Sequence, residues 1–325
     1  MSAVIRHSNA TWTLLLALLC VACSSSTTHV ARRAPSSSTS TTTVTPAAGA
    51  CGSTHAPGLT SETFTFEGQA RSYQQYVPRG YDGRTKVPVV FDFHGYGSSA
   101  AQQIVYGDFR PLADRDTFLI VAPDGQGASR HFNLGGEPGL QDDVAMVNAL
   151  LDHVEATFCV DTARVYATGM SDGGAMSSTL ACKEADRFAA FGPVAVMFYL
   201  PGCGAQRSVS MVSFMGTADP VVPFNGGRIS CCGNANIGAA PDTMASWASH
   251  DGCNATFAEE RLSSEVRRRT WSGCKNGSRV VFYIVDGGGH TWPGSIALPR
   301  LGLTTQQINA SSTIWDFFKS HPLTG

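Results

Sequence analysis

The fold is decided by residues 163–174, which read ARVYATGMSDGG. An apolar run typical of a strand, 165–168, ends at Gly169, and a helix-like segment begins with Ala175. Between them stands the pattern Gly-Met-Ser-Asp-Gly, with its serine at position 171. A sharp strand-to-helix turn exposes a serine hydroxyl, and only glycines leave room around it. The five letters alone also fit a plain glycine-rich turn, but in this context they predict that Ser171 is a nucleophile.

Strands and helices alternate on both sides of this turn. The sequence predicts strands at 63–67, 71–77, 87–93, 118–122, 165–168, 208–215 and 280–285. Helices are predicted from Asp142 to Val154, over 244–250, and around Phe317 near the end of the chain. Strands that alternate with helices predict one α/β domain, with a mostly parallel central sheet and helices on both faces.

A serine hydroxyl needs a base within hydrogen-bond reach. Three histidines, His250, His290 and His321, follow Ser171. His290 comes after the predicted strand at 280–285 and a run of three glycines, which lets its loop bring an imidazole over the end of the sheet. His250 lies in a predicted helix and His321 near the terminus. We therefore predict His290 as the general base.

An acid must hold the imidazole in the correct tautomer and stabilise its cationic form. Asp219 ends the run GTAD, which follows the predicted strand at 208–215 and opens a loop, where an orienting carboxylate belongs. Asp242 suits a helix cap and Asp286 lies in the same loop as the histidine, so both are weaker candidates. We predict Asp219 as the acid, in the chain order serine, acid, histidine.

Two backbone N–H groups should bind the oxyanion of the tetrahedral intermediate. One belongs to Asp172, directly after the serine. The other is expected in the sharp loop His94-Gly95-Tyr96 after the strand at 87–93, and the N–H of Tyr96 is our choice. His94 precedes the serine in the chain and is expected to brace this loop rather than act as the base.

Residues 1–50 are expected to lie outside the domain. Arg6 precedes a short apolar run, 14–21, which predicts a signal segment over residues 1–23. Two interpretations stay open: a bacterial lipoprotein signal with an acylated Cys23, or ordinary secretion with cleavage near the same place. Residues 24–50 are almost all Ser, Thr, Ala and Pro and predict a flexible linker. The domain then spans 51–325, and the protein is secreted.

Composition and cysteine content narrow the possible partners. The net charge of −2 shows no excess of positive charge that would attract nucleic acid. The basic run 267–269 fits a solvated strand edge. Ten cysteines minus Cys20 and Cys23 leave eight, an even number that predicts four disulfides in an exported chain. No C-x-x-C pair among these eight supports a metal site. Cys253 and Cys274 are expected to pair, and the adjacent Cys231 and Cys232 to bond different partners.

Several motifs together resemble one known family. They are FHG at 93–95, QDDV at 141–144, ARVYATGMSDGG at 163–174, GTADPVVP at 216–223, CCG at 231–233, WSGC at 271–274 and GGGHTWPG at 287–294. This set is similar to the secreted esterases that join feruloyl esterases to polyhydroxybutyrate depolymerases, in the α/β-hydrolase superfamily. The resemblance covers about residues 64–318. It implies an α/β-hydrolase fold, a triad of Ser171, Asp219 and His290, and no cofactor or metal.

The resemblance also implies carboxylic ester substrates. Feruloyl or hydroxycinnamoyl esters of plant cell-wall polysaccharide are expected first, with polyhydroxybutyrate or acetylxylan as alternatives. A non-catalytic surface protein is disfavoured because every triad member is present. Trp292 and Phe224 are expected to line an acyl pocket, although Trp292 would serve equally by packing under the histidine loop. We expect a monomer that reaches a membrane only through a lipid on Cys23.

The chain departs from this family directly after the nucleophile. The family usually has Asn there, whereas this chain has Asp172. An anion about 6 Å from the developing oxyanion repels it by roughly 3 kcal/mol at an effective dielectric constant near 20. Removing this charge in Asp172→Asn is therefore expected to raise kcat by a few-fold.

Overall fold

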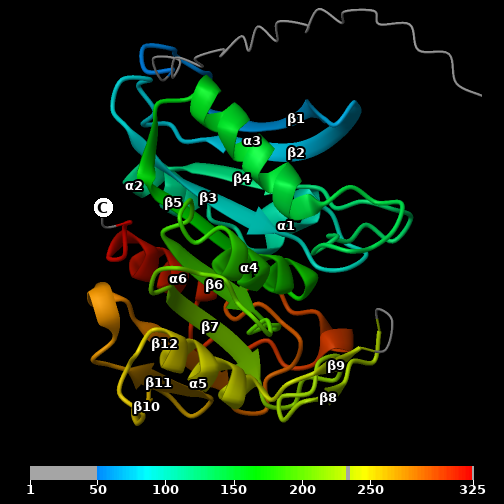
Figure 1. Cartoon of the computed structure of the whole chain (residues 1–325), viewed down its shortest axis with the longest axis vertical. Coiled ribbons are helices and arrows are strands. Elements are labelled where there is room, and N and C mark those ends of the chain that lie inside the picture. The colour runs from blue at the N-terminus through cyan, green and yellow to red at the C-terminus, as the bar shows by residue number, and fades with distance from the viewer. Residues whose placement is uncertain (1–49, 232–234, 324–325) are drawn as a thin grey trace, which may run out of the picture. The chain divides into compact units, whose positions relative to one another are not determined.

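The fold is built around a ten-stranded β-sheet (Figure 1). The computed structural model describes residues 50–231 and 235–323. The strands of this sheet are β1 (Gly58–Phe66), β2 (Gln69–Val77), β3 (Val87–Phe93), β4 (Leu119–Pro123), β5 (Val160–Met170), β6 (Ala190–Val194), β7 (Ser210–Gly216), β10 (Phe257–Arg261), β11 (Val266–Trp271) and β12 (Val280–Val285). Their spatial order is β1-β2-β4-β3-β5-β6-β7-β12-β11-β10. A separate short pair is formed by β8 (Gly227–Arg228) and β9 (Asn236–Ile237).

The middle of the sheet is parallel, as the sequence predicts. From β4 through β3, β5, β6 and β7 to β12, every neighbouring pair runs in parallel. Antiparallel pairs extend the sheet at both edges, β1 with β2 and β2 with β4 on one side, β12 with β11 and β11 with β10 on the other. The carboxyl ends of the parallel strands therefore share one edge, which is where ligands bind in sheets of this kind.

Helices cover both faces of the sheet (Figure 1). They are α1 (Ala100–Tyr106), α2 (Arg110–Asp116), α3 (Asp143–Thr157), α4 (Asp172–Lys183), α5 (Ala240–His250) and α6 (Ala310–Lys319). Successive residues of a strand point to opposite faces. Val89 and Phe91 of β3 therefore pack in one core with α3, α4 and α5, whereas Val90 packs in a second core with α1, α2 and α6. Burial on both faces explains the continuous apolar runs of the central strands.

Several elements differ from the sequence prediction, which lacks β10 and the short strands β8 and β9. The strand β6 was not predicted, because its five residues, AFGPV, contain a glycine and a proline that weaken a strand pattern. The basic run 267–269 is not the edge of the sheet, since β10 lies outside β11. Glu259 and Glu260 of β10 pair with Arg269 and Arg268 at 2.6 and 2.5 Å. Arg267 pairs with Asp286 at 2.6 Å, so each arginine of the basic run has an acidic partner.

Three disulfides join described residues: Cys51–Cys159, Cys182–Cys203 and Cys253–Cys274. The predicted Cys253–Cys274 pair is confirmed. Cys231 is also disulfide-bonded. The other six cysteines after residue 50 pair among themselves. The prediction that Cys231 and Cys232 bond different partners also involves Cys232, and it stays a prediction. Cys232 itself lies outside the described residues.

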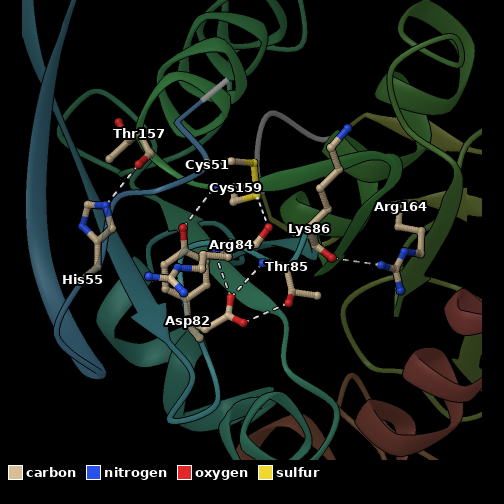
Figure 2. The surroundings of a disulfide bond; sticks show 10 residues. Cys51, His55, Asp82, Arg84, Thr85, Lys86, Thr157, Cys159 and Arg164 are labelled. Atoms are coloured by element: carbon tan, nitrogen blue, oxygen red, sulfur yellow. Dashed lines mark hydrogen bonds between the residues drawn. A yellow bond between two sulfur atoms is a disulfide. The ribbon is translucent and has the colours of Figure 1, made fainter. Parts of the chain in front are cut away.

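The Cys51–Cys159 disulfide joins the start of the described chain to the residue before β5 (Figure 2). His55 hydrogen-bonds the carbonyl of Thr157 at 3.0 Å, two residues before the disulfide. The N–H of Cys159 donates to the Tyr81 hydroxyl at 2.9 Å. These contacts tie the first residues of the domain to its central strand.

The predicted signal segment, the acylated Cys23 and all of the predicted linker except residue 50 lie outside the described residues. Among the helices of the described chain, none combines the length and the apolar character that crossing a membrane requires.

Candidate active site

Ser171 occupies the turn between β5 and α4. Its backbone has φ 57° and ψ −116°, a conformation that residues other than glycine rarely adopt. The Ser171 N–H donates to the carbonyl of Val194 at the end of β6, at 2.9 Å. Backbone strain of this kind persists only where the surrounding structure enforces it, and it concentrates at functional sites. The turn thus holds the serine at the carboxyl edge of the sheet.

The glycines around Ser171 allow the turn to approach the neighbouring strands closely. A Cβ built on Gly173 would lie 2.0 Å from the carbonyl oxygen of Phe93, and one on Gly169 would lie 2.5 Å from the same oxygen. A Cβ on Gly174 would lie 2.4 Å from the carbonyl oxygen of Val196. No side chain fits at these distances, so the glycines are required by packing against the end of β3 and the residues after β6.

His290 and Asp219 form a buried pair. Nδ1 of His290 donates to Oδ2 of Asp219 at 2.7 Å, and the two side chains are 5% and 0% exposed. The other carboxylate oxygen of Asp219 accepts the N–H groups of Val221 and Val222 at 2.7 and 2.8 Å. Because Nδ1 carries the proton of this bond, Nε2 of the neutral ring is left with a lone pair that can accept a proton.

Ser171 and His290 line one cavity of about 670 Å³. Much of its remaining lining is apolar, from Ala101, Val105, Met170, Val221, Ile296, Leu298 and Leu301. No Asp, Glu, Lys or Arg side chain lines it among the described residues. Within that part of the chain the Ser171 hydroxyl makes no hydrogen bond, and catalytic hydrogen bonds are often long until substrate binds. The cavity suits an uncharged substrate.

Two backbone N–H groups beside Ser171 have no partner in residues 50–231 and 235–323. They belong to Asp172, the first residue of α4, and to Tyr96, which follows β3. Tyr96 lines the cavity, and a Cβ on Gly95 would lie 3.3 Å from Cβ of Ser171, so this loop passes directly beside the serine. Both donors predicted for an oxyanion are therefore close to Ser171.

The prediction that Trp292 and Phe224 line the pocket is wrong, because neither residue lines this cavity. Trp292 is 1% exposed, and its indole N–H donates to Ser311 of α6 at 3.0 Å. Phe224 stacks on Phe282 of β12 at 6.2 Å between ring centres. Trp292 therefore packs under the histidine loop, which was the alternative that the sequence left open.

Sequence reasoning missed the aliphatic residues of the cavity. Val105, Ile296 and Leu298 line it and are 53%, 59% and 36% exposed. No motif marks them. The one available signal was the presence of apolar residues in the Pro- and Gly-containing segment after His290, where solvated loops are usually polar.

The side chains of His94 and Asp172 do not line the cavity. His94 is fully buried, its Nδ1 donates to the Gly95 carbonyl at 2.8 Å, and burial lowers its pKa. Oδ2 of Asp172 accepts the N–H of Phe132 at 2.8 Å, and burial raises the pKa of this carboxyl to about 6. Over the described residues no group of three or more His, Cys, Asp or Glu side chains could hold a metal ion.

Asp172→Asn is expected to stabilise the protein at neutral pH but not at pH 4. The folded-state pKa of about 6 exceeds the ordinary value of 3.8, so ionising Asp172 disfavours the folded state as the pH rises between these values. Above pH 6 the variant should gain about 1–2 kcal/mol in free energy of unfolding, after allowance for residual solvent contact. Urea unfolding of both proteins at pH 4, 5 and 7 measures this. A difference that does not change with pH would contradict it.

Known proteins resemble this chain in sequence and in fold. A family model described as Esterase PHB depolymerase matches residues 71–226. Probable feruloyl esterase C from Aspergillus terreus is 30% identical over 282 residues, which cover 83% of this chain and 91% of that protein. Feruloyl esterase C from Emericella nidulans is 32% identical over 262 residues, covering 76% and 86%. An acetyl xylan esterase from Aspergillus awamori superposes with a TM-score of 0.59 at 13% identity, over 81% of this chain and 99% of that chain.

Proposed function

The chain belongs to the esterase family that unites feruloyl esterases with polyhydroxybutyrate depolymerases, and we propose that it cleaves feruloyl and related hydroxycinnamoyl esters of plant cell-wall polysaccharide. It is a serine carboxylic ester hydrolase. The choice of acyl group is supported by relatives named feruloyl esterase C at 30% and 32% identity over most of both chains. The observation that carries the proposal is that His290, which lines the same cavity as Ser171, is hydrogen-bonded to the buried Asp219.

The proposed reaction proceeds through an acyl-enzyme. Oγ of Ser171 attacks the ester carbonyl carbon, while its proton passes to Nε2 of His290. Asp219 stabilises the imidazolium that forms. The N–H groups of Tyr96 and Asp172 donate to the oxyanion of the tetrahedral intermediate. When that intermediate collapses, His290 protonates the departing sugar alkoxide, and the acyl group stays on the serine.

Water completes the cycle. His290 removes a proton from a water molecule that attacks the acyl-serine carbonyl, and a second tetrahedral intermediate forms. Its collapse returns the proton to the Ser171 oxygen and releases the carboxylic acid. The reaction consumes one ester and one water and yields one acid and one alcohol, with every proton passing through one imidazole.

The cavity is compatible with an aromatic acyl group. Its volume of about 670 Å³ lies within the range of small-molecule sites. The absence of charged side chains from its lining, among the described residues, favours a neutral substrate. Tyr96, 42% exposed, offers an aromatic surface beside the proposed oxyanion donors.

A short-chain polyester is the second candidate substrate. Val105, Ile296 and Leu298 give one side of the cavity an aliphatic character that an aromatic ring does not require. Such a surface fits the saturated acyl chain of a polyhydroxyalkanoate. Acetylxylan remains an alternative implied by the resemblance only.

A hydrolysis panel tests these substrates. Methyl ferulate, methyl acetate, p-nitrophenyl acetate, acetylated xylan and polyhydroxybutyrate film are incubated with the wild type and with Ser171→Ala as the control. We expect kcat/KM for methyl ferulate to exceed that for methyl acetate, which has the same leaving group, by about tenfold, which corresponds to roughly 1.4 kcal/mol of added transition-state binding from the aryl group. Release of hydroxybutyrate from film, with no turnover of methyl ferulate, would replace the first candidate with the second.

The three disulfides indicate an oxidising extracellular location. We propose that the protein acts there as a monomer on polysaccharide or its fragments. Anchoring through a lipid on Cys23 is a separate proposal, and mass spectrometry of the mature N-terminus would decide it.

A further inference from the structure

The two proposed oxyanion donors come from different parts of the chain. The Tyr96 N–H follows β3, and the Asp172 N–H begins α4. To stabilise one oxygen, both must lie 2.7–3.1 Å from the same point, so a small change in their separation weakens the site. We therefore asked which residues fix one donor relative to the other.

Residues 124–133 contact the chain segments that carry the two donors, and we call these residues the bracing loop. On the side of β3, the Gly125 N–H donates to Nε2 of His94 at 2.9 Å. The Gly97 N–H donates to carbonyl oxygens of the bracing loop, to Ser129 at 2.9 Å and to Arg130 at 3.0 Å. The residues immediately before and after the Gly95–Tyr96 peptide are thus bound to the bracing loop.

His94 also sets the direction of the Tyr96 N–H. Its Nδ1 donates to the Gly95 carbonyl at 2.8 Å. That carbonyl and the Tyr96 N–H belong to the same planar trans peptide, so they point in opposite directions. Holding the carbonyl on a fully buried imidazole therefore turns the N–H away from the interior, toward the cavity that Tyr96 lines.

On the side of α4, the bracing loop binds the side chain of Asp172. The Phe132 N–H donates to Oδ2 of Asp172 at 2.8 Å. The Phe132 ring lies 4.8 Å from the ring of His94 and 5.4 Å from that of Phe93, so this residue contacts both donor segments at once. The carboxylate of Asp172 is the polar link between the bracing loop and the residue that follows the nucleophile.

The bracing loop is itself held near both ends. Oδ2 of the buried Asp143, the first residue of α3, accepts the Asn133 N–H at 2.7 Å and the Gln126 side-chain amide at 2.9 Å. Its other oxygen pairs with the guanidinium of Arg71 at 2.5 Å. Two backbone hydrogen bonds between Gln126 and His131, at 2.8 and 3.0 Å, close the loop on itself. These hydrogen bonds fix the position of the bracing loop, so the loop can hold the two donors at a constant separation.

We propose that the bracing loop sets the spacing of the two oxyanion donors, and that the side chains of Asp172 and His94 are positioning residues for the hydrolysis. This inference rests on the proposed function of Ser171. Asp172 then serves the reaction twice, with its N–H as a donor and with its carboxylate as the acceptor that places that donor. The carboxylate needs only a hydrogen-bond acceptor for the second role, not a charge.

The test compares three replacements of Asp172. Asn keeps an oxygen for the Phe132 N–H, Leu keeps the size but has no acceptor, and Ala has neither. We expect Asp172→Leu and Asp172→Ala to lower kcat for a soluble ester by about 10²-fold, the usual effect of losing one oxyanion donor, with KM within about twofold of the wild type. Asp172→Asn should keep the wild-type kcat or exceed it by a few-fold.

A second readout separates positioning from general destabilisation. Phenylboronic acid forms a tetrahedral adduct with an active serine, so its affinity should fall with kcat in the Leu and Ala variants and persist in the Asn variant. If Asp172 had only a structural role, replacing it would lower the melting temperature without a selective loss of kcat at unchanged KM. The proposal is overturned if Leu or Ala keeps kcat within about threefold, or if Asn is as impaired as they are. Should one apolar variant fail to fold, the other carries the comparison.

The outcome also distinguishes this inference from the proposed function. Hydrolysis of the same ester by Ser171→Ala at more than a few per cent of the wild-type rate would overturn the assignment of the nucleophile. An inactive Ser171→Ala together with a fully active Asp172→Leu would overturn only the role of the bracing loop.

Discussion

Ser171→Ala is expected to lower kcat for a soluble ester on the order of 10⁴-fold or more, with the fold intact. The variant loses the nucleophile but keeps the cavity and both backbone donors, which leave a small residual rate. His290→Ala should cost a similar factor, and the double variant hardly more, because the two side chains act as one unit. Single-turnover kinetics on p-nitrophenyl acetate and circular dichroism of all three variants measure this.

A matched control is available on the adjoining helix. Ser177 of α4 is fully buried, and its hydroxyl donates to the Ala167 carbonyl at 2.9 Å. Ser177→Ala should lower stability slightly and leave kcat unchanged. If Ser171→Ala kept more than a few per cent of the activity, the assignment of the nucleophile would have to be abandoned.

Gly173→Ala is expected to impair both stability and turnover. The new Cβ would lie 2.0 Å from the Phe93 carbonyl oxygen, a backbone atom that cannot rotate away. Either β3 or α4 must move, at a cost of about 2–4 kcal/mol in free energy of unfolding. Because β3 leads into Tyr96 and α4 begins with Asp172, the same shift separates the donors and should lower kcat by about 10²-fold.

Gly204→Ala is the control for this prediction. A Cβ there would meet only the Cys182 carbonyl, at 3.9 Å, which is an ordinary contact. Its effect on the free energy of unfolding should stay within about 0.5 kcal/mol. Urea unfolding and steady-state kinetics of both variants provide the comparison, and wild-type behaviour of Gly173→Ala would show that the turn is less constrained than its packing indicates.

The sequence predicted the sheet and its functional edge because these leave local traces. Ser171, Asp219 and His290 each follow a strand and stand among glycines or at a loop, and parallel strands bring their carboxyl ends to one edge. The Cys253–Cys274 pair could be predicted because both cysteines lie in one short segment. The carboxylate after Ser171 is visible in the sequence, but its partner is not, since the partner is the backbone N–H of Phe132.

What could not be predicted depends on contacts between distant segments. The bracing loop acts through the backbone N–H groups of Gly125 and Phe132. Every residue except proline carries such a group, so no side-chain pattern in the sequence marks these two. Trp292 was predicted to line the cavity because it is close to His290 in the chain. In the structure its indole is buried in the core beneath the histidine loop. The partner of Cys51 lies 108 residues away, a separation that no local motif spans.

The position of the Cys51–Cys159 disulfide has a mechanical consequence. A pulling force applied to the residues before Cys51 passes through the sulfur atoms into the residue that precedes β5. The segment from 52 to 158, which contains the edge hairpin of β1 and β2, lies outside this load path. Tension from the N-terminal side therefore enters the sheet at β5, in its parallel middle, and does not peel the β1–β2 hairpin away from the edge.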